Sequence, residues 1–103
     1  MYISKDLAQW QSFVSVLEQA VKEGKTQEIL MLLMTPDERD TIGLRLQIVS
    51  ELIDGRLPQR EIQNKLHTSA ATITRGSNMM KTMSPELLNW VKNTLDMQKP
   101  TLE

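Results

Sequence analysis

The sequence contains no cysteine, which excludes disulfides, cysteine-ligated metal centres and thiol catalysis. Histidine is almost as scarce. A serine–histidine pair or a histidine metal site would depend on His67 alone. Glycine and proline number four each, too few for a collagen-like or low-complexity chain. An enzyme is therefore the weakest interpretation, because these residues assemble no convincing nucleophile–base pair or metal site.

Long hydrophobic segments are also missing. The longest unbroken apolar run, Ile29–Met34, has six residues, whereas a membrane span needs roughly 20. The first ten residues contain neither the apolar core of a signal peptide nor a cleavage site. We therefore expect a cytoplasmic protein without a membrane partner. The length of 103 residues, with 40% apolar and 24% charged residues, predicts one domain over 1–103.

Apolar residues recur at intervals of three and four almost throughout, which is typical of amphipathic helices. Glycines end two of these stretches, and Thr35-Pro36 with Glu38 forms a capping box that begins another. No strand pattern and no repeat is present. The sequence predicts an all-α fold of six short helices. Their segments are Leu7–Val21, Gln27–Met34, Pro36–Asp54, Gln59–Leu66, about Ala70–Thr82, and a last helix from Pro85. In the third helix we expect inward positions at Ile42, Leu46, Val49, Leu52 and Ile53.

The formal net charge of −1 conceals an uneven distribution. From Gly55 to Lys81 there are five basic residues and one acid, so this segment carries +4. The remainder has seven basic and twelve acidic residues, a net of −5. Charges are felt within about 8–10 Å in physiological salt, so a basic segment can bind DNA phosphates although the whole chain is slightly acidic. Charge alone leaves open a merely solvated surface.

Residues 59–82 have the pattern of a helix-turn-helix, in which two helices are joined by a short turn. Ile62 and Leu66 form the inner face of the first helix, and Ile73 packs the second helix back against them. Ser69 closes the three-residue turn and is a good N-cap for the second helix. Together with the basic charge, this pattern predicts DNA binding.

Two positions depart from the commonest form of the motif. Gln63 stands where a small residue is common, and His67 stands where glycine is common because the backbone there is left-handed. Histidine tolerates that conformation better than most residues do, so we interpret His67 as a turn residue and not as a ligand. The second helix begins with small or hydroxylated side chains that can approach base edges closely. These are Ala70, Ala71, Thr72 and Thr74.

The segment Ile29–Met34 has no polar side chain, and a helix without a polar face must be buried on all sides. One small subunit of short helices can hardly bury it, whereas a partner chain can. We therefore expect a homodimer. The alternative is a core helix buried within a monomer.

Four strings of residues make the pattern specific. They are Thr35–Arg39, Gly43–Arg45, Gln59–Ile62 and Ala71–Asn78. Across about Leu7–Leu95 their order and spacing closely resemble the bacterial tryptophan repressor family. The resemblance implies an intertwined homodimer of six-helix subunits that binds palindromic operator DNA in the major groove. It also implies L-tryptophan as corepressor and repression of tryptophan biosynthesis genes.

The resemblance places the corepressor between the body and the DNA-reading helices. Arg75 would pair with its carboxylate and Arg45 would cover its indole, because a guanidinium binds carboxylates and stacks on aromatic rings. Carbonyl groups of Leu32, Met34 and Thr35, the last two from the partner subunit, would accept from the ammonium. The Thr35 hydroxyl would also serve the carboxylate.

Three further positions complete the implied pocket. Val49 would shape it. Gly76 lies inside a predicted helix, where glycine costs about 1 kcal/mol relative to alanine, so either the helix kinks or something approaches its backbone closely. An indole lying against the helix would supply the reason. Met79 stands where the best-known form of the family has a serine that reaches the ligand. The implied ligand-binding set is Leu32, Met34, Thr35, Arg45, Val49, Arg75, Gly76 and Met79.

We expect DNA contacts from both helices of the motif and from the body. The candidates for phosphates or groove edges are Arg45, Gln59, Arg60, Gln63, Ser77, Asn78 and Lys81, and those for reading bases are Ala70, Ala71, Thr72 and Thr74. Ala70 replaces a larger apolar residue that is frequent in the family, which affects operator preference. Pro58 replaces a capping serine, so one side-chain hydrogen bond is lost.

Two rival interpretations stay open at this point. One is a related repressor-fold DNA-binding protein that answers to another ligand or to none. Arg45, Arg75 and Gly76 argue against it, and Met79 keeps it open. The other is a helical interaction module whose basic face meets an acidic protein, although such a module would not need the string from Thr72 to Asn78.

Overall fold

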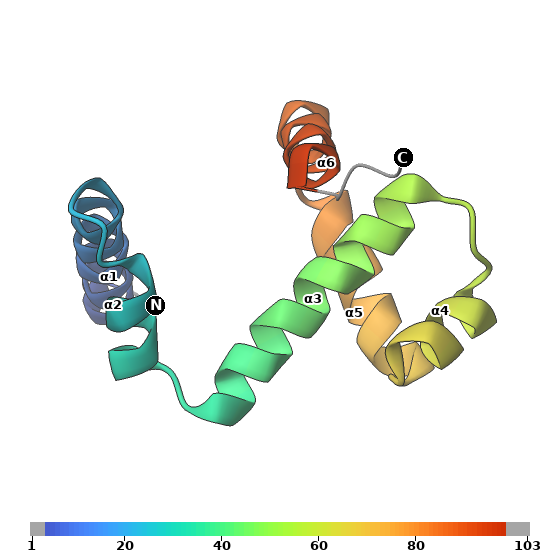
Figure 1. Cartoon of the computed structure of the whole chain (residues 1–103), viewed down its shortest axis with the longest axis horizontal. Helices are drawn as coiled ribbons and strands as arrows, with labels where there is room; N and C mark the ends of the chain where they lie inside the picture. Colours follow the sequence, from blue (N-terminus) through green and yellow to red (C-terminus); the bar gives the residue numbers. More distant parts are fainter. Residues whose placement is uncertain (1–3, 99–103) are drawn as a thin grey trace. The chain divides into compact units, whose positions relative to one another are not determined.

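The computed structural model describes residues 4–98, and within them it has six helices and no strand. The predicted all-α class is therefore confirmed, with helix boundaries close to the predicted ones. The helices are α1 (Ser4–Lys22), α2 (Thr26–Leu33), α3 (Pro36–Asp54), α4 (Gln59–Leu66), α5 (Ala70–Lys81) and α6 (Pro85–Gln98), as labelled in Figure 1.

The helices begin and end where the sequence supplies partners for their terminal backbone groups. The Thr35 amide donates to Glu38 Oε1 at 2.8 Å and the Glu38 amide donates to Thr35 Oγ1 at 3.2 Å, which is the predicted capping box. Ser84 caps α6 by accepting from the Leu87 amide at 3.1 Å. Gly24 and Gly55 follow α1 and α3 with φ of +74° and +71°, the left-handed geometry in which glycine ends a helix.

The chain divides into two compact units, with the boundary between Arg39 and Asp40 in the first turns of α3. In the first unit α1 packs against α2. Ala20 is the one buried apolar residue described there, and Trp10 stacks at a tilt on Phe13 with ring centroids 5.5 Å apart. This unit therefore has little core of its own.

The apolar side chains of α2 are unusually exposed. No residue of this helix is buried, and the exposed fractions are 61% for Met31, 75% for Leu32 and 52% for Leu33. The prediction that its own chain could hardly bury this segment agrees with these values. No helix of residues 4–98 is long and apolar enough to cross a bilayer.

The second unit has a small, well-defined core that seats the helix-turn-helix. Ile48 of α3, Ile62 of α4 and Ile73 of α5 are 0%, 1% and 2% exposed. Four half-buried leucines surround them, Leu44, Leu52, Leu57 and Leu66. The predicted inner positions of both short helices are thus confirmed, and the core holds α4 and α5 against the C-terminal half of α3 (Figure 1).

One prediction about α3 is wrong. Ile42 and Leu46 were expected to face inward, yet they are 50% and 43% exposed, whereas Ile48 is completely buried. The cause is that α3 has apolar residues on more than one side. The side that its own chain covers carries Leu44, Ile48 and Leu52, spaced four residues apart.

Candidate nucleic-acid interface

The turn between α4 and α5 has the geometry that its sequence predicts. His67 has φ of 54° and ψ of 51°, which is the left-handed conformation. The amides of His67 and Thr68 both donate to the carbonyl of Gln63, and the bond from Thr68 is 3.1 Å long. The three-residue connection is therefore a closed, hydrogen-bonded turn, and it fixes the direction in which α5 leaves α4.

Ser69 caps α5 as predicted. Its Oγ accepts from the Thr72 amide at 3.1 Å and lies 2.9 Å from Thr72 Oγ1. The Thr72 hydroxyl is therefore part of the cap, and its side chain is half-buried. A base contact by Thr72 would have to share this hydroxyl or use the methyl group.

The start of α4 is held without a side-chain cap. Pro58 is the N-cap and makes no side-chain hydrogen bond, as its sequence predicts, but its carbonyl accepts from the amides of Glu61 and Ile62 at 3.0 and 3.1 Å. Gln59 supplies a compensating tie, because its Nε2 donates to the carbonyl of Ala70 at 3.3 Å. This bond joins the first residues of α4 and α5.

The outer side of α5 is a continuous exposed stripe. Its members recur at the three- and four-residue spacing of one helix face, and they combine two small residues with polar and basic ones. They are Ala70, Ala71, Thr74, Arg75, Asn78 and Lys81. We call them the α5 stripe. All six are among the residues predicted to bind DNA or the corepressor, and the opposite side of α5 carries buried Ile73.

The predicted DNA contacts outside the α5 stripe differ in how exposed their side chains are. Arg60 on α4 and Arg45 on α3 are exposed. Gln63 and Ser77 are half-buried, so only part of each side chain can reach a ligand. Exposure therefore favours Arg45 and Arg60 as phosphate contacts over these two.

Gly76 has a reason in this structure that the sequence could not reveal. A β-carbon at this position would lie 2.9 Å from Cγ2 of Ile48. The helix α5 is continuous from Ala70 to Lys81, so the close approach to its backbone comes from a side chain of α3. An indole is not needed to explain this glycine.

The residues predicted to hold the corepressor divide between the two units. In the second unit, Arg45 and Val49 lie on α3 and Arg75 and Met79 on α5. Neither arginine forms an ion pair with another described residue. Two such guanidinium groups on adjoining helices suit a ligand that has both a carboxylate and an aromatic ring. Met79 is 59% exposed and brings no hydrogen-bond donor.

The other three predicted ligand residues belong to the first unit. Leu32 is near the end of α2, and Met34 is its C-cap, with an extended backbone and an amide that donates to the Leu30 carbonyl at 2.9 Å. Thr35 has its amide and hydroxyl engaged in the capping box with Glu38. A further bond from the Thr35 hydroxyl to a carboxylate would have to share that oxygen.

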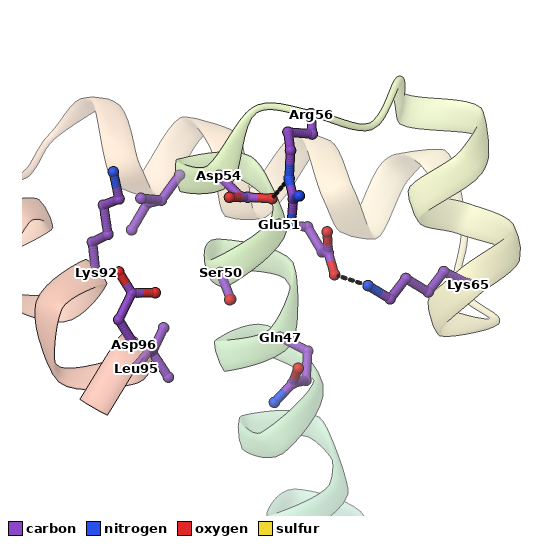
Figure 2. Close-up of a pocket in the computed structure, with 10 residues that line it drawn as sticks. Gln47, Ser50, Glu51, Asp54, Arg56, Lys65, Lys92, Leu95 and Asp96 are labelled. Atoms are coloured by element: carbon purple, nitrogen blue, oxygen red, sulfur yellow. Dashed lines mark hydrogen bonds and ion pairs between the residues drawn. The ribbon is translucent and has the colours of Figure 1, made fainter. Parts of the chain in front are cut away.

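A polar cavity of about 200 Å³ lies beside the motif, between the C-terminal end of α3, α4 and α6 (Figure 2). Lys65 Nζ contacts Glu51 Oε2 at 2.5 Å, and Arg56 Nε contacts Asp54 Oδ2 at 2.6 Å. The hydrogen bond to Asp54, with the charge of that carboxylate, raises the pKa of Arg56. Two of the five basic residues between Gly55 and Lys81 therefore have an acidic partner within the chain.

Three residues in the contacts between α3 and the motif are not predicted from sequence. Ile48 was absent from the predicted inward face, and the Glu51–Lys65 pair joins residues fourteen apart on different helices. Spacing within one helix gives no signal for such a pair. The only hint is compositional, since Lys65 belongs to the basic segment and Glu51 to the acidic remainder.

Among residues 4–98, no group of three or more potential ligands is placed to hold a metal ion. The structure has a hydrogen-bonded turn, a capped second helix and an outward stripe of small, polar and basic side chains. These features define a helix-turn-helix protein of the DNA-binding regulatory class.

Comparison with known proteins makes the class more specific. The family model described as Trp repressor protein matches residues 8–95. Proteins named Trp operon repressor homolog are similar over nearly the whole length. The one from Pasteurella multocida (strain Pm70) is 64% identical over 98 residues, covering 95% of this chain and 96% of that protein. Those from Haemophilus influenzae (strain PittEE) and Histophilus somni (strain 2336) are 62% and 57% identical, covering 94% and 93% of this chain and 96% and 91% of those proteins.

The chain therefore belongs to the Trp repressor family. It is a transcriptional regulator of the repressor type, and not an enzyme.

Proposed function

We propose that this chain forms a cytoplasmic homodimer that binds palindromic operator DNA when L-tryptophan is bound, and so blocks transcription of tryptophan biosynthesis genes. The observation that carries the proposal is the α5 stripe on a capped second helix of a helix-turn-helix. Membership of the Trp repressor family supports the choice of corepressor and operator. Operator DNA lies in the cytoplasm, which supports that compartment.

The dimer is supported by α2, whose side chains Met31, Leu32 and Leu33 are more than half exposed in their own chain. Burial of such surface contributes about 25 cal/mol per Å², so a second copy is a large source of stability. A two-fold dimer presents two reading helices about one turn of DNA apart, as is known for helix-turn-helix repressors including the tryptophan repressor. A palindromic site matches that symmetry.

The corepressor would be held by the residues that the family resemblance implies. Arg75 would pair with the carboxylate and Arg45 would cover the indole, with Val49 shaping the wall beside it. Carbonyl groups of Leu32, of the partner's Met34 and of the partner's Thr35 would accept from the ammonium. Bound tryptophan supplies contacts that favour the arrangement of reading helices that fits successive major grooves, and this difference in affinity shifts the population.

The exposure of several side chains supports the proposed DNA contacts. Arg45, Arg60 and Lys81 would neutralise phosphates, and each such contact adds to the salt dependence of binding. Base edges would be read by the small residues at the start of α5 and by Thr74, with the hydroxyl or methyl groups that suit thymine and adenine. The candidates for both roles remain Arg45, Gln59, Arg60, Gln63, Ala70, Ala71, Thr72, Thr74, Ser77, Asn78 and Lys81.

A mobility-shift titration on a palindromic operator, with and without tryptophan, tests the proposal. We expect affinity to rise at least about tenfold with tryptophan, a coupling of ~1.4 kcal/mol. Arg75→Ala should abolish this response and keep its helical content. Arg56→Ala is the matched control, because Arg56 lies in the same basic segment but pairs with Asp54. Equal affinity with and without tryptophan contradicts the proposal.

The second candidate is a regulator of the same fold that answers to another ligand, and Met79 is the observation that favours it. A thioether in place of a hydroxyl donor suits a more apolar ligand. Calorimetry with tryptophan and with indole analogues lacking the carboxylate separates the two. Tighter binding of tryptophan favours the first candidate, and tighter binding of an analogue favours the second.

A further inference from the structure

The side of α3 that packs on the motif contacts each of its two helices at a separate point. Ile48 meets α5 at Gly76. Glu51, three residues further along and on the same side of α3, meets α4 at Lys65. Figure 2 shows the Lys65 side chain reaching from α4 to the Glu51 carboxylate. The two contacts therefore lie about one turn apart on a single helix.

The contact at Glu51 differs from a surface ion pair. The Glu51 side chain is only 13% exposed, whereas Lys65 is 57% exposed. A carboxylate largely withdrawn from water is strongly destabilising without a partner. Lys65 forms the ion pair with Glu51, and the charge of Arg56 also acts on this carboxylate. By contrast, Arg56 is 78% exposed and pairs with Asp54 only two residues away in the chain, which constrains no second helix.

The rest of α4 has few ties to α3. Its apolar anchors are buried Ile62 and half-buried Leu66, and apolar contacts define the rotation of a helix about its own axis less sharply than a charge contact does. Its first residue is bonded to α5 and its N-cap lacks a side-chain bond. Lys65 is in the last turn of α4, one residue before Leu66 and the left-handed turn. A charge contact there is therefore well placed to orient α4 on α3.

We propose that the Glu51–Lys65 ion pair is a positioning element of the helix-turn-helix formed by α4 and α5. The pair orients α4 on α3 and, through the turn, it also orients α5. Lys65 therefore acts on operator binding through Glu51 and not through a DNA phosphate. This inference rests on the proposed function for its effect on DNA. Its effect on α4 itself does not depend on DNA.

The first test measures amide hydrogen exchange of α4 in the full-length protein without DNA. Lys65→Met and Glu51→Gln should each speed exchange in α4 about threefold to tenfold. The charge-reversed double variant, Glu51→Lys with Lys65→Glu, should restore most of the protection. Lys92→Met is the matched control, because Lys92 lines the same cavity and loses the same charge. Unchanged exchange in Lys65→Met overturns the proposal.

The second test measures operator affinity against salt concentration, with tryptophan, at a temperature where circular dichroism shows every variant folded. Lys65→Met should bind about threefold to tenfold more weakly, with an unchanged slope of log affinity against log salt. A lost phosphate contact would instead reduce that slope by about 0.9, and this result overturns the proposal. A merely stabilising pair would lower the melting temperature and leave the affinity of the folded protein unchanged, which also overturns it.

The two proposals fail in different ways. If the wild-type protein binds neither tryptophan nor the operator, the proposed function is contradicted, and the exchange data still decide whether the pair orients α4. If the wild-type protein binds both, and the variants exchange and bind as it does, only the positioning role is contradicted.

Discussion

Gly76 of α5 lies directly against Ile48 of α3, so closely that a β-carbon on the glycine would come within 2.9 Å of Ile48 Cγ2. Ile48 is completely buried and its branch at Cβ is stiff. It cannot move away without disturbing Ile62 and Ile73 in the same core. The helix α5 can therefore approach α3 this closely only because residue 76 has no β-carbon.

Gly76→Ala should consequently destabilise the protein. Overpacking costs about 1–3 kcal/mol and the better helix propensity of alanine returns about 1 kcal/mol, so we expect a net loss of about 1 kcal/mol in the free energy of unfolding. Urea unfolding measures it. Gly43→Ala is the control, because that glycine lies in α3 with nothing within 4 Å of an added β-carbon, and this variant should be more stable.

A double variant locates the cause of the Gly76 effect. Ile48→Leu moves the branch from Cβ to Cγ and so removes the methyl group that Gly76 accommodates. In that background Gly76→Ala should cost little or nothing. If its cost is the same in both backgrounds, the contact between these two residues does not explain the glycine.

The local elements of this fold could be predicted from sequence because their signals are local. The capping box at Thr35 and Glu38 and the cap at Ser69 each lie within four residues and have the expected hydrogen bonds. The left-handed turn at His67 also has the predicted backbone conformation.

The inward side of α3 could not be predicted in the same way. Ile42 and Leu46 belong to an apolar pattern as regular as that of Ile48, and periodicity does not say which apolar side a chain covers by itself. The Glu51–Lys65 pair was also missed, because the two residues meet only once α4 has folded back on α3. The candidate site was found mainly through resemblance and through the charge of its segment.

Ser69 tests the cap of the reading helix. Ser69→Ala removes the acceptor of the Thr72 amide and should cost about 1 kcal/mol of stability. Ser69→Asp should keep the cap and the stability while weakening operator binding, because it adds a negative charge beside the α5 stripe. Thermal unfolding and mobility shift, run on both variants, separate the two effects. Equal stability of Ser69→Ala and wild type would show that the cap contributes nothing.

His67 tests the strain of the turn. A left-handed conformation costs a residue with a β-carbon about 1–2 kcal/mol. Substitution by glycine removes this cost, but part of the stabilisation is lost because glycine has greater freedom in the unfolded chain. We therefore expect His67→Gly to stabilise the protein by about 0.5–1 kcal/mol. Thr68→Gly, at a neighbouring position without positive φ, should destabilise it. The prediction fails if His67→Gly unfolds at the same or a lower urea concentration.

The exposed apolar side chains of α2 test the homodimer. Met31 is 61% exposed in its own chain, so Met31→Asp should weaken association measured by sedimentation, whereas Gln27→Asp on the same helix should not. In addition, the unfolding midpoint of the wild-type protein should rise with protein concentration, because association stabilises the folded state by mass action. A midpoint independent of concentration, with monomeric sedimentation, contradicts the dimer.

Met79 tests the specificity of the proposed corepressor pocket. It lies four residues after Arg75, on the same side of α5, and is 59% exposed. Met79→Ser supplies a hydroxyl donor, and one additional hydrogen bond is worth about 0.5–1.5 kcal/mol. Calorimetry should therefore show tryptophan binding about threefold to tenfold tighter, whereas Met83→Ser, beyond the end of α5, should bind as wild type does. If Met79→Ser binds tryptophan no better, residue 79 does not contact the ligand, and the second candidate function loses the observation that favours it.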